Sequence, residues 1–170
     1  PLGARRRPRA RLVVIPTDLD PARIAALLET RRYGRSIDVR DRTGSTNDDA
    51  LRARDVPDGH VVLADTQTHG RGSQGRSWDS PAGSDLYFSI VVHVGALAAA
   101  SLPTMTLAVG LGVARACEAL VDGEVMLKWP NDVRLDRRKC AGILVESVSI
   151  GARVDRVVIG VGVDVNRETW

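Results

Sequence analysis

The stretch from residue 125 to 165 constrains the fold most, because it places strand patterns in series with only short turns between them. These apolar, β-branched segments are 125–129, 133–135, 140–148 and 154–165. Parallel neighbours need a crossover of about a dozen residues, so strands joined this closely must pair antiparallel. The chain also lacks a regular alternation of strand and helix. We therefore predict an α+β domain with one mixed, largely antiparallel β-sheet flanked by helices.

The first two thirds of the chain supply helices and further strands. Asp20 and Pro21 predict the start of a helix that continues to about residue 32, with Gly34 as its end. Ser45 predicts the cap of a second helix that runs to about residue 54. A third, longer helix is predicted at 103–121. The remaining predicted strands are 12–15, 37–39, 61–68 and 86–94.

Composition excludes several classes of protein. Residues 1–11 hold five arginines and no acid, and the rest of the chain is slightly acidic. Such a segment could touch nucleic acid or acidic lipid, but we interpret it as a disordered tail. No apolar run reaches the roughly 18 residues that span a bilayer, so we expect no membrane partner. The only cysteines, Cys117 and Cys140, lack metal-ligand spacing, which favours a reducing, cytoplasmic location.

Residues 69–85 form a long glycine- and serine-rich loop. The motif G-R-G-S-Q-G at 70–75 matches G-x-G-x-x-G, but no helix pattern follows it, so a dinucleotide fold is disfavoured. Glycines let the backbone approach a ligand closely, and Arg71 and Arg76 suit carboxylate or phosphate. Trp78 offers a flat apolar wall. The alternative is a surface loop with solvated arginines.

The few lysines and asparagines of the chain gather in short motifs. Both lysines and all three asparagines fall in S-T-N at 45–47, K-W-P-N-D at 128–132, K-C-A-G-I-L at 139–144 and G-V-G-V-D-V-N at 160–166. Together with Q-T-H-G-R-G at 67–72, these motifs closely resemble the catalytic domain of biotin protein ligases. The resemblance runs from about Ile37 to Asn166. Lipoate ligases share this fold in outline, but K-W-P-N-D with K-x-A-G points to the biotin branch.

The resemblance implies a two-step reaction. Biotin is first activated with ATP to biotinyl-5′-AMP, and the biotinyl group is then transferred to a lysine of a biotin carboxyl carrier protein. ATP is expected with Mg²⁺, which the phosphates would hold, and we name no metal-binding side chain. The alternatives are an impaired module that binds biotin or its adenylate without efficient turnover, or a lipoate-type acyl ligase.

The resemblance also assigns site residues. The expected catalytic residues are Lys139, Arg71, Arg76, Lys128 and Asp132. The expected biotin-binding residues are Ser45, Thr46, Asn47, Gln67, Gly70, Arg71, Gly72, Ser73, Lys139 and Gly142. The expected ATP-binding residues are Arg71, Arg76, Trp78, Asn131, Lys139, Gly160, Gly162 and Asp164. The plainer alternatives are a helix cap for Ser45 and Thr46, a turn for Asn131 and Asp132, a solvated charge for Lys128 and a core position for Trp129.

The sequence departs from the family pattern at two of these positions. Ser73 stands where an arginine is usual, and Asp164 stands where an asparagine is usual. We predict a tail at 1–11 and a catalytic domain at 12–170 that is incomplete at its C-terminal end, because family members continue with a further helix and a small β-barrel. The residues that precede the resemblance are too few for a winged DNA-binding domain, so no sequence-specific DNA binding is expected. The sequence leaves open whether the chain forms a homodimer.

Overall fold

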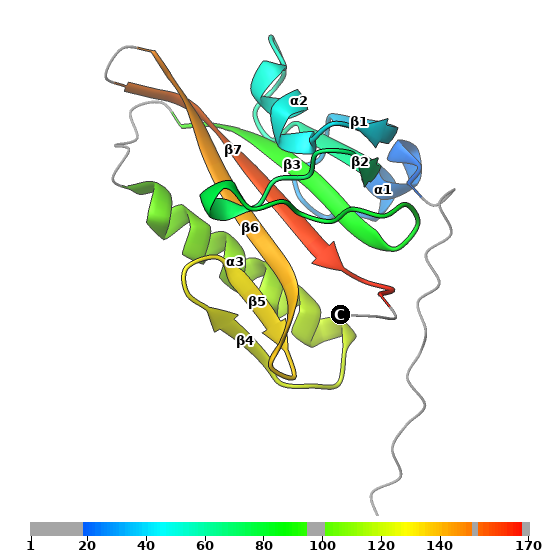
Figure 1. Ribbon diagram of the computed structural model, residues 1–170. Helices are drawn as coiled ribbons and strands as arrows, with labels where there is room; N and C mark the ends of the chain where they lie inside the picture. Colours follow the sequence, from blue (N-terminus) through cyan, green and yellow to red (C-terminus); the bar gives the residue numbers. More distant parts are fainter. Residues whose placement is uncertain (1–18, 95–100, 151–152, 168–170) are drawn as a thin grey trace, which may run out of the picture.

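A computed structural model describes residues 19–94, 101–150 and 153–167 of the chain (Figure 1). Seven strands form one sheet in the order β1-β2-β3-β7-β6-β5-β4. Only β1 and β2 pair in parallel, and every other neighbouring pair is antiparallel. The strands are β1 (Ile37–Thr43), β2 (Val61–Gln67), β3 (Asp85–His93), β4 (Val125–Lys128), β5 (Asp132–Leu135), β6 (Arg138–Ile150) and β7 (Arg153–Asp164). The prediction of a mixed, largely antiparallel sheet is confirmed.

Three α-helices accompany the sheet among the described residues: α1 (Pro21–Leu27), α2 (Thr46–Arg52) and α3 (Leu102–Leu120). Side chains alternate between the two faces of a strand, and β7 shows which helix covers which face. Val157 and Val161 belong to the buried cluster that includes Ala114 of α3. Val158, between them, packs with Ala50 of α2. The two helices therefore cover opposite faces of the sheet, and Gly160 and Gly162 open on the α2 side.

The short turns of the C-terminal strands behave as the sequence predicts. Asp136 and Arg137 take positive φ angles of 48° and 69°, which is the backbone that a two-residue hairpin turn requires. β5 and β6 pair directly across this turn, with Leu135 opposite Arg138. The hairpin predicted across 136–138 is confirmed, with Arg138 already inside β6.

The first helix is shorter than predicted. It ends at Leu27 rather than near residue 32, and Leu28 is extended. Leu27 is 81% exposed, so this helix buries too little apolar surface to extend by packing. Gly34 instead donates a backbone hydrogen bond to the carbonyl oxygen of Gly59, which fixes the following segment against another turn. The strand predicted at 12–15 and the tail at 1–11 lie outside the described residues.

No helix in the described part of the chain is both long and apolar enough to cross a membrane.

Candidate active site

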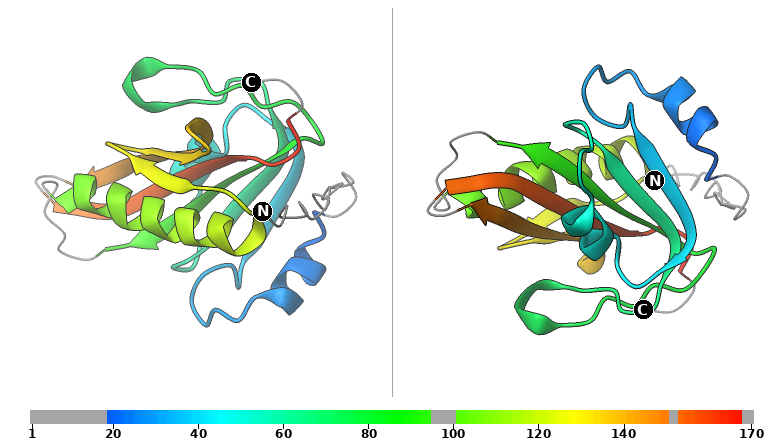
Figure 2. Two further views of the ribbon diagram at one scale, coloured as in Figure 1. Left: turned by 90° about the horizontal axis from the view of Figure 1, so that it is seen from below. Right: turned by 90° about the horizontal axis from the view of Figure 1, so that it is seen from above.

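The glycine-rich loop between β2 and β3 lies over the face of the sheet opposite α3 (Figures 1 and 2). Inside this loop, residues Ser73–Gly75 form a short 3-10 turn, η2. A cavity of about 520 Å³ lies between the loop, the start of α2 and the strands β6 and β7. It is lined by Ser45, Thr46, Asn47, Gln67, Arg71, Gly72, Ser73, Arg76, Ser77, Trp78, Asn131, Arg138, Lys139, Gly142, Ile143, Leu144, Gly160, Val161, Gly162, Asp164 and Arg167.

Most of the predicted site residues come together in this cavity. Three of them do not line it: Gly70, Lys128 and Asp132. Lys128 is exposed at the end of β4, whereas Asp132 is buried and contacts a lining residue. Gly70 is needed for packing, because a Cβ there would lie 2.8 Å from Ser80 Oγ and closer still to the carbonyl oxygen of Trp78. The side chain of Trp129 is not in the core, since that residue is 67% exposed.

The start of α2 presents buried polar side chains to the cavity. Ser45, Thr46 and Asn47 are each less than 5% exposed. Ser45 occupies the cap position, but its side chain makes no capping hydrogen bond, so the cap interpretation does not explain this serine. Thr46 donates its backbone N–H to Gln67 Oε1 at 2.9 Å. Asn47 donates its amide to Glu146 and accepts a hydrogen bond from Ser89, so hydrogen bonds to neighbouring residues hold this polar cluster in place.

Side chains from other parts of the chain lie directly on the glycines of β6 and β7. A Cβ on Gly142 or Gly162 would lie 2.6 Å from atoms of the Trp78 ring. A Cβ on Gly160 would overlap the amide of Asn47. Gly160 and Gly162 share one strand face as predicted, but Asn47 and Trp78 cover that face here. The glycines therefore permit Trp78 to lie directly on the sheet.

Lys139 sits between a carboxylate and an aromatic ring. Its Nζ lies 2.6 Å from Asp132 Oδ1 and 5.0 Å from the centre of the Trp78 ring. A cation over an indole face is attracted by the quadrupole of the ring. Two groups from different elements thus fix the ammonium at the edge of the cavity, close to Gly142.

The two loop arginines have different partners. Arg71 forms ion pairs with Asp48 of α2 at 2.6 Å and with Glu146 of β6 at 2.7 Å. The hydrogen bond to Glu146 is the main cause that raises the pKa of Arg71 above its usual value. Arg76 donates to the carbonyl oxygen and the hydroxyl of Ser73. Asn131 donates to the same hydroxyl, so Ser73 links Arg76 to Asn131 at the position where the family pattern has an arginine.

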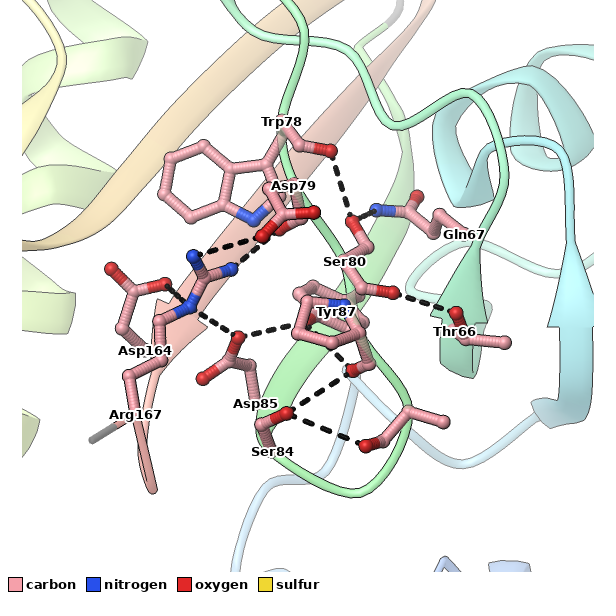
Figure 3. A network of polar contacts seen from close by, with 12 residues as sticks. Thr66, Gln67, Trp78, Asp79, Ser80, Ser84, Asp85, Tyr87, Asp164 and Arg167 are labelled. Carbon is pink, nitrogen blue, oxygen red and sulfur yellow. Dashed lines mark hydrogen bonds and ion pairs between the residues drawn. The ribbon is translucent and has the colours of Figure 1, made fainter. Parts of the chain in front are cut away.

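Arg167 is a site residue that the sequence analysis missed. Figure 3 shows its guanidinium among three acidic residues near the end of β7. Its Nε lies 2.7 Å from Asp85 Oδ2 and 3.1 Å from Asp164 Oδ1, and its terminal nitrogen donates to the carbonyl oxygen of Asp79 at 2.6 Å. Burial raises the pKa of Asp164 to about 6, although Arg167 opposes that shift. Arg167 therefore joins the loop to the sheet beside Trp78.

Asp164 gives the folded protein a pH dependence whose sign follows from this raised pKa. Asp164 binds a proton more tightly in the folded chain than in the unfolded chain, where its pKa is near 3.8. The stabilisation is full below about pH 4 and is lost as the pH rises through 6, by up to about 3 kcal/mol. We expect the free energy of unfolding of Asp164→Asn, relative to that of the native chain, to be higher at pH 7 than at pH 4. Urea unfolding of both proteins at both pH values measures this difference. The prediction would be wrong if this difference in unfolding free energy stayed constant or moved in favour of the native chain at pH 7.

Cationic side chains outnumber acidic ones in the cavity wall, and Arg71, Lys139 and Arg167 also pair with acids outside it. Five cationic residues line it against one acid, Asp164. A mixed sheet that carries such a cavity under a glycine-rich loop agrees with the family that the sequence motifs resemble. The chain belongs to the Biotin/lipoate A/B protein ligase family, whose model matches residues 33–164.

Individual relatives agree with this assignment. The biotin–[acetyl-CoA-carboxylase] ligase of Mycobacterium tuberculosis is 38% identical over 140 residues, which are 78% of this chain and 50% of that protein. The bifunctional ligase/repressor BirA of Bacillus spizizenii is 33% identical over 166 residues, which are 96% of this chain and 51% of that protein. The chain thus spans about half the length of the curated relatives it matches.

Solved structures show the same fold. The biotin protein ligase of Aquifex aeolicus in complex with biotin and ATP superposes with a TM-score of 0.67 at 31% identity, over 80% of this chain and 55% of that one. The Leishmania major enzyme in complex with biotinyl-5-AMP gives a TM-score of 0.63 at 32% identity, over 76% of this chain and 57% of that one.

Proposed function

We propose that this chain is the catalytic part of an ATP-dependent biotin protein ligase. The observation that carries the proposal is Lys139, which is held at the edge of a cation-lined cavity between Asp132 and Trp78. Biotin and ATP both bring negative charge to the reaction, so such a cavity suits their encounter. The names of the relatives, and the solved complexes with biotin and ATP, support the same substrates.

Each part of the cavity fits one part of biotin. The buried hydroxyl and amide groups of Ser45, Thr46, Asn47 and Gln67 would bind the polar ureido group. The Trp78 ring, which itself lies on the bare backbone at Gly142, would form one wall for the apolar bicyclic ring. The carboxylate would then lie toward Lys139, whose compact ammonium offsets its charge.

The first chemical step joins biotin to the nucleotide. A carboxylate oxygen of biotin attacks the α-phosphorus of ATP, the bond to the β-phosphate oxygen breaks, and pyrophosphate leaves. Lys139 stabilises the charge that builds up as these two anions meet, and it is already in place when the reaction begins. In the second step a lysine amine of a biotin carboxyl carrier protein attacks the acyl carbon and AMP leaves.

Magnesium would enter this reaction on the nucleotide. In the described part of the chain, no three side chains of His, Cys, Asp or Glu come together to hold a metal ion. We expect the ATP phosphates to bind the ion, which would neutralise part of their charge. The free thiols of Cys117 and Cys140 agree with a cytoplasmic location for this chemistry.

The test is the exchange of labelled pyrophosphate into ATP by the chain itself. We expect exchange that depends on biotin and does not occur when lipoate replaces it. Exchange with lipoate alone would favour the lipoate branch. Tight biotin binding without any exchange would indicate a binding module.

A further inference from the structure

Glu146 of β6 lies where three parts of the cavity wall meet, and no role was assigned to it from the sequence. Its two carboxylate oxygens accept three hydrogen bonds. Arg71 donates to Oε1 at 2.8 Å and to Oε2 at 2.7 Å, and Asn47 donates its amide to Oε2 at 2.8 Å. One carboxylate thus joins the glycine-rich loop, the start of α2 and the sheet.

Only an ionised carboxylate satisfies this set of donors. A glutamine of the same length has one acceptor oxygen and one donor amide. In one orientation its NH2 group would face Arg71 alone, and in the other it would face both Arg71 and Asn47, so the bidentate contact to Arg71 is lost either way. The bidentate contact to a guanidinium is also among the stronger hydrogen bonds in proteins. The side chain at this position therefore determines whether both partners keep their places.

Backbone hydrogen bonds connect the residues beside Arg71 to the rest of the loop. Gly72 donates its backbone N–H to the carbonyl oxygen of Arg76, and Trp78 donates its own to that of Gly70. Residues on both sides of Arg71 are thus bonded to the segment that carries Trp78. Asn47, the other partner of Glu146, lies directly on Gly160 and accepts a hydrogen bond from Ser89.

We propose that Glu146 is a positioning residue for biotin, which acts by holding Arg71 and Asn47 in the cavity wall. This inference rests on the proposed function for its ligand. Glu146 itself does not line the cavity. It acts through Arg71 on the loop that covers the ligand and through Asn47 on the polar end of the cavity.

The experiment compares Glu146→Gln with Asp38→Asn. Asp38 forms an exposed ion pair with Arg40 on β1 at 2.8 Å, so this control also removes a carboxylate from an arginine but lies outside the cavity. Hydrogen exchange of residues 70–78 is measured without ligand, and biotin affinity is measured by calorimetry. We expect Glu146→Gln to speed exchange in this segment and to weaken biotin binding by about tenfold or more, while Asp38→Asn changes neither.

A second variant guards against a folding defect. Arg71→Gln removes the same contact from the loop side, together with the ion pair to Asp48. In the double variant, Glu146→Gln should add less than its effect in the native chain, because the Arg71–Glu146 interaction is already gone. Native exchange rates and native biotin affinity in Glu146→Gln, or full additivity, would overturn the proposal. If the native chain bound no biotin, the proposed function would fail, whereas the exchange measurement would still decide whether Glu146 holds the loop.

Discussion

Lys139→Ala should slow biotin-dependent exchange of pyrophosphate into ATP by about a hundredfold or more while the chain stays folded. The ammonium is fixed by Asp132 at 2.6 Å and by the Trp78 ring, so its charge is oriented before the substrates meet. Losing a preorganised charge of this kind removes about 3 kcal/mol or more of transition-state stabilisation, roughly a hundredfold in rate. The measurement is the exchange rate at saturating biotin and ATP.

Two further variants separate the charge of Lys139 from its packing, and separate its role from that of Lys128, the other lysine of the chain. Lys139→Met keeps the aliphatic stem against Trp78 and should lose as much activity as Lys139→Ala. Lys128→Ala should cost far less, because Lys128 is exposed and does not line the cavity. Near-native exchange in Lys139→Ala would remove this residue from the reaction, and an equal loss in Lys128→Ala would show that both lysines act.

Gly142→Val should eliminate biotin binding. A Cβ at this position would lie 2.6 Å from Trp78 Cζ3 and 3.3 Å from Lys139 Cε, and the branched side chain adds two more carbons. The loop side chain can move away, so the fold survives, but Trp78 then no longer lies on the sheet and Lys139 is displaced. We expect biotin affinity to fall at least about a hundredfold by calorimetry, since both a wall and a charge of the cavity are lost.

Gly112 supplies the matched control. It lies on the exposed side of α3, and a Cβ there would meet nothing within 4 Å. Gly112→Ala should therefore leave biotin affinity unchanged and stabilise the helix by about 1 kcal/mol. Gly142→Ala should already weaken binding, because a single carbon is enough to touch the ring. Unchanged affinity in a folded Gly142→Val variant would place the biotin site elsewhere.

The sheet was predictable because its turns are short. A connection as brief as Asp136–Arg137 allows only antiparallel neighbours, and the structure pairs those strands accordingly. The end of α1 was not predictable in the same way. Gly34 is a reasonable stop signal, but the helix ends earlier because it buries no residue completely and the next segment bonds to the turn at Gly59. Tertiary contact decided that boundary.

The site was predictable where a motif gathers residues that are close in sequence. Lys139 and Gly142 stand three apart on one strand, and Ser45 to Asn47 open one helix. Glu146 and Arg167 have no such signal, because they act on residues 75 and 88 positions away. In a chain with 22 arginines and 21 acidic residues, only the folded structure identifies which of them pair.

Arg71 and Arg167 both anchor the glycine-rich loop, and their ion pairs differ in how far they are exposed to dissolved ions. Arg71 and its partners are 25–38% exposed, so dissolved ions screen that anchor. Arg167 holds the other arm by a hydrogen bond to the carbonyl oxygen of Asp79. Its guanidinium is itself fixed by Asp85, whose side chain is fully buried, so ions reach this anchor less. We therefore expect rising ionic strength to loosen the loop first at its Arg71 end.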